Sequence, residues 1–170
     1  MNILVRNVQK ADIPAVVRLK IDGWKSAYKD IIDDDFLNGL DDSFNVQVAR
    51  MEGDYNSGGF VVAESKNEVV GFCRYAFDNH FSPDQDGVDC ELLAIYVKPD
   101  LKYLGIGTKL FEHVVNEFKK QNKHKMILWC LKDNEPAKKF YAKMGGEIIR
   151  ERTIELGDKK YLECGFEYNF

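Results

Sequence analysis

The sequence of 170 residues predicts an α/β fold, a central mixed β-sheet flanked by helices. Strand-like runs and helical patterns alternate along the chain, and pairs of strands that suit hairpins stand near both ends. After Lys125, the run KMILWCL at 125–131 is continuously apolar, as expected of a strand buried on both faces of a sheet. No repeat or low-complexity linker interrupts the chain, so we expect a single domain spanning residues 1–170.

The first elements follow from apolar spacing. Residues 2–8, NILVRNV, alternate in polarity and predict a strand. Asp12 stands where it can cap a helix that carries Pro14 in its first turn. One face of that helix would hold the apolar residues Ile13, Val16, Val17 and Ile21. The segment DDDFLNGL at 33–40 predicts a second, shorter helix.

The middle of the chain predicts three strands and a helix. Residues 58–65 and 68–77 are apolar runs joined by Lys66 and Asn67, which indicates a hairpin. Residues 90–97, CELLAIYV, predict a third strand. The helix after it would place one apolar row on a single face: Ile106, Leu110, Val114 and Phe118.

The C-terminal part predicts a short helix between strands. The helix, at 134–146, has Pro136 near its start and Gly145 or Gly146 past its end. Two strands would close the chain, at 146–156 and 159–168, with Gly157 and Asp158 as the turn. The hairpin completes the mixed sheet.

Composition restricts the class of partner. The formal net charge is −4 and the pI about 5.5, which argues against nucleic acid because phosphate binding needs a concentrated basic face. No long apolar segment could span a bilayer, and the N-terminus lacks the pattern of a signal peptide. We therefore expect a soluble, cytoplasmic protein without a membrane partner, and the sequence leaves a homodimer open.

The cysteines and histidines do not suggest a metal site. Each of the four cysteines lies in a separate strand-like run, at Cys73, Cys90, Cys130 and Cys164. No CxxC pair and no His/Cys cluster with zinc spacing occurs. We predict buried free thiols and no protein-bound metal.

Two glycines stand where the strand at 90–97 gives way to the next helix. A helix N-terminus exposes backbone N–H groups and the positive end of the helix dipole. Gly105 and Gly107 lack the side chains that would keep an anion away. A phosphate or pyrophosphate would then be cradled by the main chain of Leu104, Gly105, Ile106, Gly107 and Thr108, with Lys102 adding charge nearby. The alternative is a tight turn that only starts a helix.

This loop fits neither of two common phosphate motifs. The dinucleotide fingerprint GxGxxG fails because its third glycine position is Leu110. The Walker pattern fails because no Gly-Lys-Ser/Thr follows.

Three segments resemble the GCN5-related N-acetyltransferase (GNAT) superfamily, in particular its small-molecule members. Residues 102–107, KYLGIG, resemble its pyrophosphate loop Gln/Arg-x-x-Gly-x-Gly/Ala, although Lys102 keeps the charge without the planar fork of arginine. Residues 134–145 are similar to Asn-x-x-Ala-x-x-Phe-Tyr-x-x-x-Gly. Trp24 and Tyr28 resemble a Trp-x-x-x-Tyr segment. The order and spacing of all three fit.

The resemblance implies a GNAT-like domain with a splayed pair of parallel strands, 90–97 and 125–131. The pantetheine arm of acetyl-CoA, the co-substrate, would lie in the wedge and pair with the backbone of Ile95, Tyr96 and Val97. Asn134 would hydrogen-bond the arm, with Ala137 and Phe140 beside it. The implied reaction is direct acetyl transfer to the primary amine of a small molecule, without an acyl-enzyme.

The chemistry needs a base, an acid and a donor to the thioester oxygen. Glu91 is the candidate base, acting through water, or else a solvated charge at a strand start. By resemblance Tyr141 is the candidate acid, or else a core aromatic. The backbone N–H near Val97 could hold the oxygen. Trp24 and Tyr28, one helical turn apart, would line the acceptor side or pack in the core.

The acceptor stays open. Aspartates gather at 30–42 and 78–89, which indicates either solvated loops or a rim that attracts a cationic amine. Two alternatives to a small-molecule enzyme also stand: a peptide or protein amine acetyltransferase, and a non-catalytic acyl-CoA-binding sensor. Retention of Glu91, Asn134 and Tyr141 together favours the enzyme.

Overall fold

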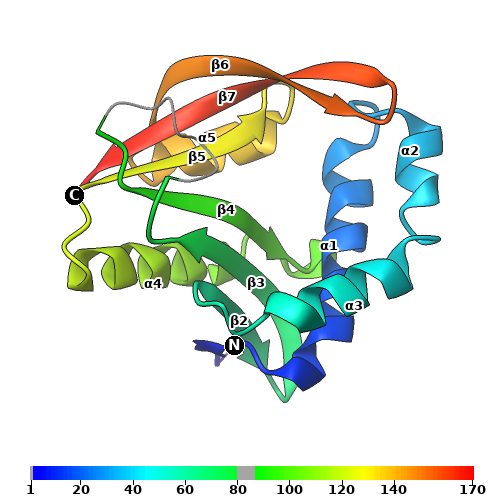
Figure 1. Ribbon diagram of the computed structural model, residues 1–170, viewed down its shortest axis with the longest axis horizontal. Coiled ribbons are helices and arrows are strands. Elements are labelled where there is room, and N and C mark those ends of the chain that lie inside the picture. The colour runs from blue at the N-terminus through cyan, green and yellow to red at the C-terminus, as the bar shows by residue number, and fades with distance from the viewer. Residues whose placement is uncertain (1, 80–86) are drawn as a thin grey trace. The chain divides into compact units, whose positions relative to one another are not determined.

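The described residues, 2–79 and 87–170 of a computed structural model, form a seven-stranded mixed sheet in the order β1-β2-β3-β4-β5-β7-β6 (Figure 1). The strands are β1 (Leu4–Asn7), β2 (Phe60–Ser65), β3 (Glu68–Ala76), β4 (Cys90–Val97), β5 (Lys125–Leu131), β6 (Glu147–Leu156) and β7 (Lys159–Asn169). The helices are α1 (Ile13–Tyr28), α2 (Asp34–Gly39), α3 (Phe44–Asp54), α4 (Ile106–Lys120) and α5 (Glu135–Lys143), with 3₁₀ turns at η1 (Lys10–Asp12) and η2 (Pro99–Leu101). The β4–β5 pair is parallel, which confirms the predicted mixed sheet.

The chain divides into two compact units. Unit 1 is Met1–Tyr75 with Ala94–Val115, and unit 2 is Ala76–Leu93 with Asn116–Phe170. β4 contributes its first four residues to unit 2 and its last four to unit 1. Each unit has its own packing, described separately below.

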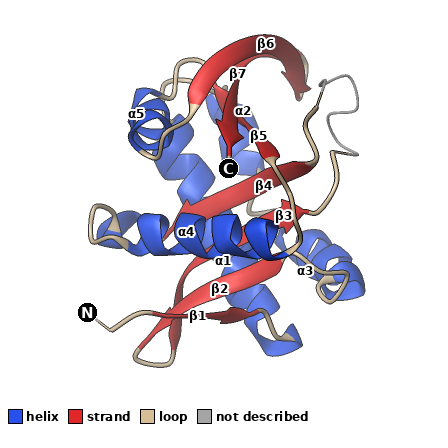
Figure 2. Ribbon diagram, turned by 90° about the vertical axis from the view of Figure 1, so that its left-hand side faces the viewer, coloured by secondary structure: helices blue, strands red, loops and turns tan. Residues whose placement is uncertain are grey.

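In unit 1, α1 and α3 pack on one face of the sheet and α4 on the other (Figure 2). The first face presents Phe60, Val62 and Phe72 to the buried side of α1. On the second face, Gly71 lies against the side chains at the start of α4: its Cβ position would be 3.2 Å from Ile106 Cγ2. Successive strand residues point to opposite faces of a sheet. The alternation along β2 and β3 therefore determines which residues pack against α1 and α3 and which pack against α4.

Helix α3 was not predicted from the sequence. Its buried side carries Phe44, Val48 and Met51, which are spaced i, i+4 and i+7 and pack against the core of unit 1. This spacing is a helical signal that the sequence contained. The exposed Val46 within the same segment blurs the stripe.

The predicted hairpin at Lys66–Asn67 is confirmed. β2 and β3 pair antiparallel up to Ser65 and Glu68, and both turn residues have positive φ, 51° and 64°. Two positive φ values at the central positions define a type I′ turn, whose twist suits the flanking strands.

In unit 2, α5 lies against β7 and ends at the predicted glycine pair. Gly145 has a φ of 93°, and the N–H of Gly146 donates to the carbonyl of Tyr141 at 3.1 Å, as in a Schellman C-cap. A Cβ at Gly146 would lie 2.5 Å from Tyr168 Cζ. The first glycine therefore allows the turn, and the second makes room for a ring from β7.

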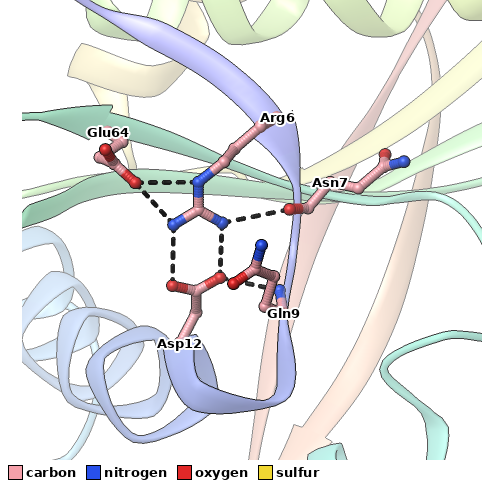
Figure 3. Close-up of polar contacts among 5 residues, drawn as sticks. All are labelled: Arg6, Asn7, Gln9, Asp12 and Glu64. Atoms are coloured by element: carbon pink, nitrogen blue, oxygen red, sulfur yellow. Dashed lines mark hydrogen bonds and ion pairs between the residues drawn. The ribbon is translucent and has the colours of Figure 1, made fainter. Parts of the chain in front are cut away.

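The N-terminal elements of unit 1 meet at Arg6 (Figure 3). Arg6 Nε and Nη2 donate to Glu64 at 2.8 and 2.7 Å, and Nη1 and Nη2 donate to Asp12 at 2.7 and 2.9 Å. Asp12 is the N-cap residue of α1, as predicted, but its side chain makes no capping bond, because this carboxylate accepts from Arg6 and from the N–H of Gln9 instead. The arginine thus ties β1 to β2 and to the start of α1.

All four cysteines are free and buried, as predicted. Burial raises the pKa of the Cys73 thiol well above its ordinary value. A thiol held in this protonated form is a poor nucleophile.

Loss of the Arg6 guanidinium should lower the free energy of unfolding. Arg6→Met leaves two partly buried carboxylates without their donor, so we expect a loss of about 1–3 kcal/mol at pH 7. Hydrogen bonding to Arg6 holds the pKa of the Asp12 carboxyl below its usual value. A lowered folded pKa gives stability that is complete above the unfolded value of about 3.9 and is lost as the pH falls through the folded pKa.

The measurement is chemical denaturation of both proteins between pH 7 and pH 3, with Arg50→Met, an exposed position on α3, as control. The gap between Arg6→Met and the wild type should narrow at the acid end. A gap of constant size over this range would show that Asp12 does not contribute through its charge.

Candidate active site

The glycine loop joins η2 to α4 in unit 1. Tyr103 and Gly105 both have positive φ, 67° and 82°, so the chain turns sharply twice before the helix begins at Ile106. The first intrahelical bond runs from the N–H of Lys109 to the carbonyl of Gly105 at 3.0 Å. The three N–H groups before Lys109 therefore precede the helical ladder and point out of the helix end.

Residues 103–105 of the loop are open to solvent. Tyr103 and Leu104 are exposed, and Gly105 has open space where a Cβ would be. The Nζ of Lys102 lies 3.4 Å from the hydroxyl of Ser26 on α1. The bare backbone at the start of α4 fits a group of negative charge such as a pyrophosphate.

The second half of β4 presents its backbone groups alternately. The N–H of Lys98 donates to the carbonyl of Val70 on β3 at 2.9 Å. Along a strand the N–H and C=O groups of every second residue face the same neighbour. The N–H and C=O groups of Tyr96 therefore face β3, whereas those of Ile95 and Val97 point away from it.

This alternation refines the predicted set of backbone contacts. The carbonyl of Tyr96 approaches Gly71, whose Cβ position would be 3.0 Å away, and its ring stacks on Phe72 with centroids 5.4 Å apart. The ring also abuts Gly23 of α1, where a Cβ would lie 2.8 Å from Cδ1. Tyr96 is thus a packing residue, and only the backbone groups of Ile95 and Val97, among the three predicted residues, point away from β3.

Trp24 and Tyr28 meet as predicted. Their rings are T-shaped with centroids 5.0 Å apart, and Phe36 of α2 joins them at 6.2 Å from Trp24. The indole N–H of Trp24 is buried and has no hydrogen-bond partner among the described residues. A buried donor without a partner costs about 1–3 kcal/mol, so this group fits a ligand or an ordered water that accepts from it.

Glu91 lies in unit 2, near the start of β4. It is 3% exposed and pairs in register with Ile127 of the parallel strand β5. The prediction left a solvated charge as the alternative, and this burial excludes it. The recorded β4–β5 register covers Cys90–Leu92, the part of β4 that belongs to this unit.

Asn134 has a local structural role that the sequence analysis did not anticipate. It is the N-cap of α5, and its Oδ1 accepts from the N–H of Ala137 at 3.3 Å. The residue is 7% exposed, and its Nδ2 has no hydrogen bond to another described residue. The capping bond fixes the orientation of the side-chain amide.

Tyr141 packs on the side of α5 that faces β7. Its ring contacts Phe140 and Phe166 with centroids 5.5 and 5.6 Å away, and its carbonyl accepts from the hydroxyl of Tyr168 at 2.9 Å. The aromatic packing expected of a core residue is therefore present. The ring of Tyr141 is only partly buried.

The predicted site residues thus fall into two sets. Unit 1 brings together the glycine loop, the end of β4 and the Trp24–Tyr28 pair. Unit 2 holds Glu91 and the residues of α5. Phe36 and Ser26 join the first set without having been predicted, although DDDFLNGL and the helix surface around Trp24 were the segments that contained them.

Comparison with known proteins identifies the family. The model of the acetyltransferase (GNAT) family matches residues 24–146, which begin at Trp24 and end just past α5. An uncharacterized N-acetyltransferase of Bacillus subtilis, YuaI, is 26% identical over 163 residues, covering 96% of this chain and 91% of the relative. The chain belongs to the GNAT family, and the predicted class of enzyme, an N-acetyltransferase, is confirmed.

Solved structures share the fold. The PaiA N-acetyltransferase of Thermoplasma acidophilum, in complex with coenzyme A, has a TM-score of 0.77 at 18% identity, with full coverage of both chains. YncA of Salmonella typhimurium, a putative acetyltransferase with acetyl-CoA, has a TM-score of 0.69 at 18% identity and covers 99% of this chain and 94% of its own.

None of the helices among the described residues is both long and apolar enough to cross a bilayer.

A methyl group at Gly107 should weaken coenzyme A binding without harming the fold. The Cα–Cβ bond of a helical residue tilts toward the helix N-terminus, so a Cβ at the second position of α4 would enter the space in front of the N–H groups. Alanine is also the better helix former, by about 0.5–1 kcal/mol. For Gly107→Ala we expect an affinity loss of about tenfold or more and a melting temperature that does not fall.

Calorimetric titration with coenzyme A measures the effect, and the larger Gly107→Val should lose binding altogether. Gly53→Ala in α3, where a Cβ would meet nothing within 4 Å, is the matched control. Unchanged affinity in folded Gly107→Val would refute the anion cradle.

Proposed function

We propose that the chain transfers the acetyl group of acetyl-CoA directly to the primary amine of a small molecule, and that residues 1–170 act as one domain. Family membership supports acetyl-CoA as the co-substrate. The observation that carries the proposal is the helix end at Ile106, where backbone N–H groups follow two sharp turns and Gly105 has open space in place of a side chain. Bound there, acetyl-CoA supplies the thioester whose acetyl group is transferred.

In this proposal the chain binds the co-substrate at two further places. The backbone groups of Ile95 and Val97 that point away from β3 would pair with the pantetheine arm. The NH₂ group of Asn134 would donate to the same arm, with Ala137 and Phe140 beside it. The N–H of Val97 would also hold the thioester oxygen as it gains charge.

Glu91 and Tyr141 would move the protons. The amine reaches the enzyme as an ammonium and must lose a proton before it can attack. Glu91 would accept this proton through a water molecule, and its burial keeps the carboxylate in one position. Tyr141 would donate a proton to the departing thiolate, and its packing between Phe140 and Phe166 would hold the phenol in place.

The acceptor would bind beside Trp24 and Tyr28. The buried indole N–H of Trp24 supports an acceptor that carries an oxygen able to accept a hydrogen bond. A cationic acceptor has weaker support from the aspartates. Asp33 caps α2, Asp41 binds Arg18 and Lys25, and Asp89 accepts from backbone N–H groups, while Asp84 and Asp86 lie outside the described residues.

The experiment that tests the function is release of free thiol from acetyl-CoA with a panel of amines and peptides, with the acetylated product identified by mass. We expect turnover with small amines, and Glu91→Gln should lower it by about a hundredfold at neutral pH because the base is lost. The affinity for acetyl-CoA should be nearly unchanged in this isosteric variant.

Glu155→Gln is the matched control, since Glu155 is exposed near the β6–β7 turn. Equal activity of Glu91→Gln and the wild type across the pH profile would remove Glu91 from the mechanism. Turnover of peptides alone would favour a peptide acetyltransferase, and binding of acetyl-CoA without thiol release would favour a sensor.

Tyr141→Phe separates the acid role from packing, because it deletes one hydroxyl and keeps the ring. The loss of turnover should be modest, about tenfold to a hundredfold. The thiol of coenzyme A, with a pKa of about 8.5, is already a fair leaving group. The measurement is turnover beside the melting temperature and the affinity for coenzyme A, neither of which should change much.

Tyr168→Phe provides the contrast. Its hydroxyl donates to the Tyr141 carbonyl from a buried position, so this variant should lose stability, by about 1 kcal/mol. If Tyr141→Phe instead kept wild-type turnover, or lost only as much activity as its lowered stability explains, the residue would be structural.

A further inference from the structure

One face of the unit 2 sheet carries two arginines on its edge strand. In register, Trp129 of β5 pairs with Gly165 of β7, which pairs with Arg150 of β6. Two residues further along the sheet, Glu163 of β7 pairs with Arg152 of β6. Residues paired across neighbouring strands point to the same face, so these side chains lie together. The opposite face is the one that packs on α5, through Phe166 and Tyr168.

A β-bulge decides on which face the arginines lie. Glu147 and Ile148 of β6 pair one to one with Glu167 and Phe166 of β7. Arg150 then pairs with Gly165, so Ile149 is an extra residue. Without it Arg150 would lie opposite Cys164 and point to the face of α5, because a slip of one residue moves a side chain to the other face.

Each guanidinium is held by a glutamate through Nε alone. Arg150 Nε donates to Glu167 at 3.0 Å, and this carboxylate, 5% exposed, also lies 2.7 Å from Lys125 Nζ. Arg152 Nε donates to Glu163 at 2.8 Å, and the carboxylate of Glu163 is 13% exposed. Bonds to such carboxylates orient the guanidinium planes.

Trp129 adds a rigid support for the second arginine. The Arg152 guanidinium carbon is 4.0 Å from the centroid of the Trp129 ring. On its cross-strand side the ring lies on Gly165, where a Cβ would be 3.0 Å from Cζ3. Planar stacking of this kind is favourable for arginine and costs little of its remaining freedom.

The terminal nitrogens of both arginines have no hydrogen bond to any described residue. The side chains of Arg150 and Arg152 are 31% and 37% exposed, so these NH₂ groups reach solvent. A guanidinium has five N–H donors in a planar fork, and only the Nε donor of each is used. The pair thus presents two oriented forks of the shape that binds a carboxylate through two parallel bonds. Lys125 adds a third cation, which offsets the exposed Glu147 in the row of Glu167.

The arginines lie on the same face as Glu91. Glu91 pairs with Ile127, and Ile127 pairs with Glu167, the glutamate that holds Arg150. Two strand spacings of about 4.8 Å separate Glu91 from Glu167, about 10 Å in all. Because Glu167 holds Arg150, an amine at Glu91 and an anion at Arg150 in one molecule would be about this far apart or more, on either side of the buried Ile127, so several bonds must separate them.

We propose that Arg150, with Arg152 beside it, binds a carboxylate of the acceptor, so that the acceptor is an amine with a carboxylate several bonds away. A free amino acid with an amine at the end of its side chain and a short peptide with a free C-terminus share this chemistry. The proposal rests on the acetyl transfer proposed above and narrows its acceptor.

The test compares acceptors that differ only in the carboxylate. Lysine, lysine amide and 1,5-diaminopentane have the same terminal amine, and diglycine with its amide forms the peptide arm. We expect kcat/KM for the acid to exceed that of its partner by about tenfold to a hundredfold, the value of a hydrogen bond to a charged group. The arm with the larger ratio identifies the source of the carboxylate.

Arg150→Gln should abolish this preference by raising KM for the acid, and Arg150→Lys, which keeps the charge but not the fork, should reduce it. Lys160→Gln should keep the preference for the acid. Lys160 is exposed and lies two residues from Leu162, so both side chains are on the opposite face of the β6–β7 hairpin from the arginines. A wild type without the preference, or a folded Arg150→Gln that retains it, would overturn the proposal and leave acetyl transfer intact.

Calorimetry keeps the two proposals separate. Lysine and 1,5-diaminopentane are titrated into the protein with coenzyme A, where no turnover occurs. If no amine in the panel releases thiol, the proposed function fails. Tighter binding of lysine, lost in Arg150→Gln, would still support the carboxylate site, and equal binding of the two amines would overturn it.

Discussion

The main-chain hydrogen bonds of β4 determine where the groups of the candidate site stand. This strand pairs with β5 through Cys90–Leu92 and meets β3 at Lys98 and Val70. The first pairing sets Glu91 in a row with Ile127 and fixes its face. The second sets the parity of the last residues, so that Ile95 and Val97 direct their N–H and C=O groups away from β3. Residues next to β4 leave room for this hydrogen-bond pattern. Gly71, which has no side chain, allows the carbonyl of Tyr96 to come close.

The start of α4 depends on backbone conformation in the same way. Positive φ values at Tyr103 and Gly105 turn the chain, and the ladder of the helix begins only at Lys109. The helix does not require glycine at 107, because an alanine there would form the helix better by about 0.5–1 kcal/mol. A glycine there costs the helix some stability, and in the proposed function it is kept because it leaves the N–H groups of the loop open to an anion.

Charges in the two units are used differently. In unit 1, all three nitrogens of Arg6 donate hydrogen bonds, to Glu64, Asp12 and a backbone carbonyl. This arginine therefore has a structural role. In unit 2, Arg150 and Arg152 each donate one hydrogen bond, from Nε, to a buried or nearly buried glutamate. The two terminal NH₂ groups of each guanidinium have no such bond within the part of the chain that the structure describes. An ion pair that orients a guanidinium but leaves most of its donors without partners contributes little to stability. It is a sound arrangement for recognition.

The sequence by itself determined the alternation of strands and helices, the turn at Lys66–Asn67, the end of α5 at Gly145 and the glycine loop, because apolar spacing and backbone freedom at asparagine and glycine are local properties. It also contained, unrecognised, the Phe44–Val48–Met51 stripe of α3. Only the tertiary structure decided which backbone groups of β4 face away from β3, that Asn134 caps α5 and that Asp12 binds Arg6. The clearest case is Arg150: its sequence neighbours cannot reveal the bulge at Ile149, since a bulge exists only relative to the partner strand β7, and that register sets the face on which the arginine lies.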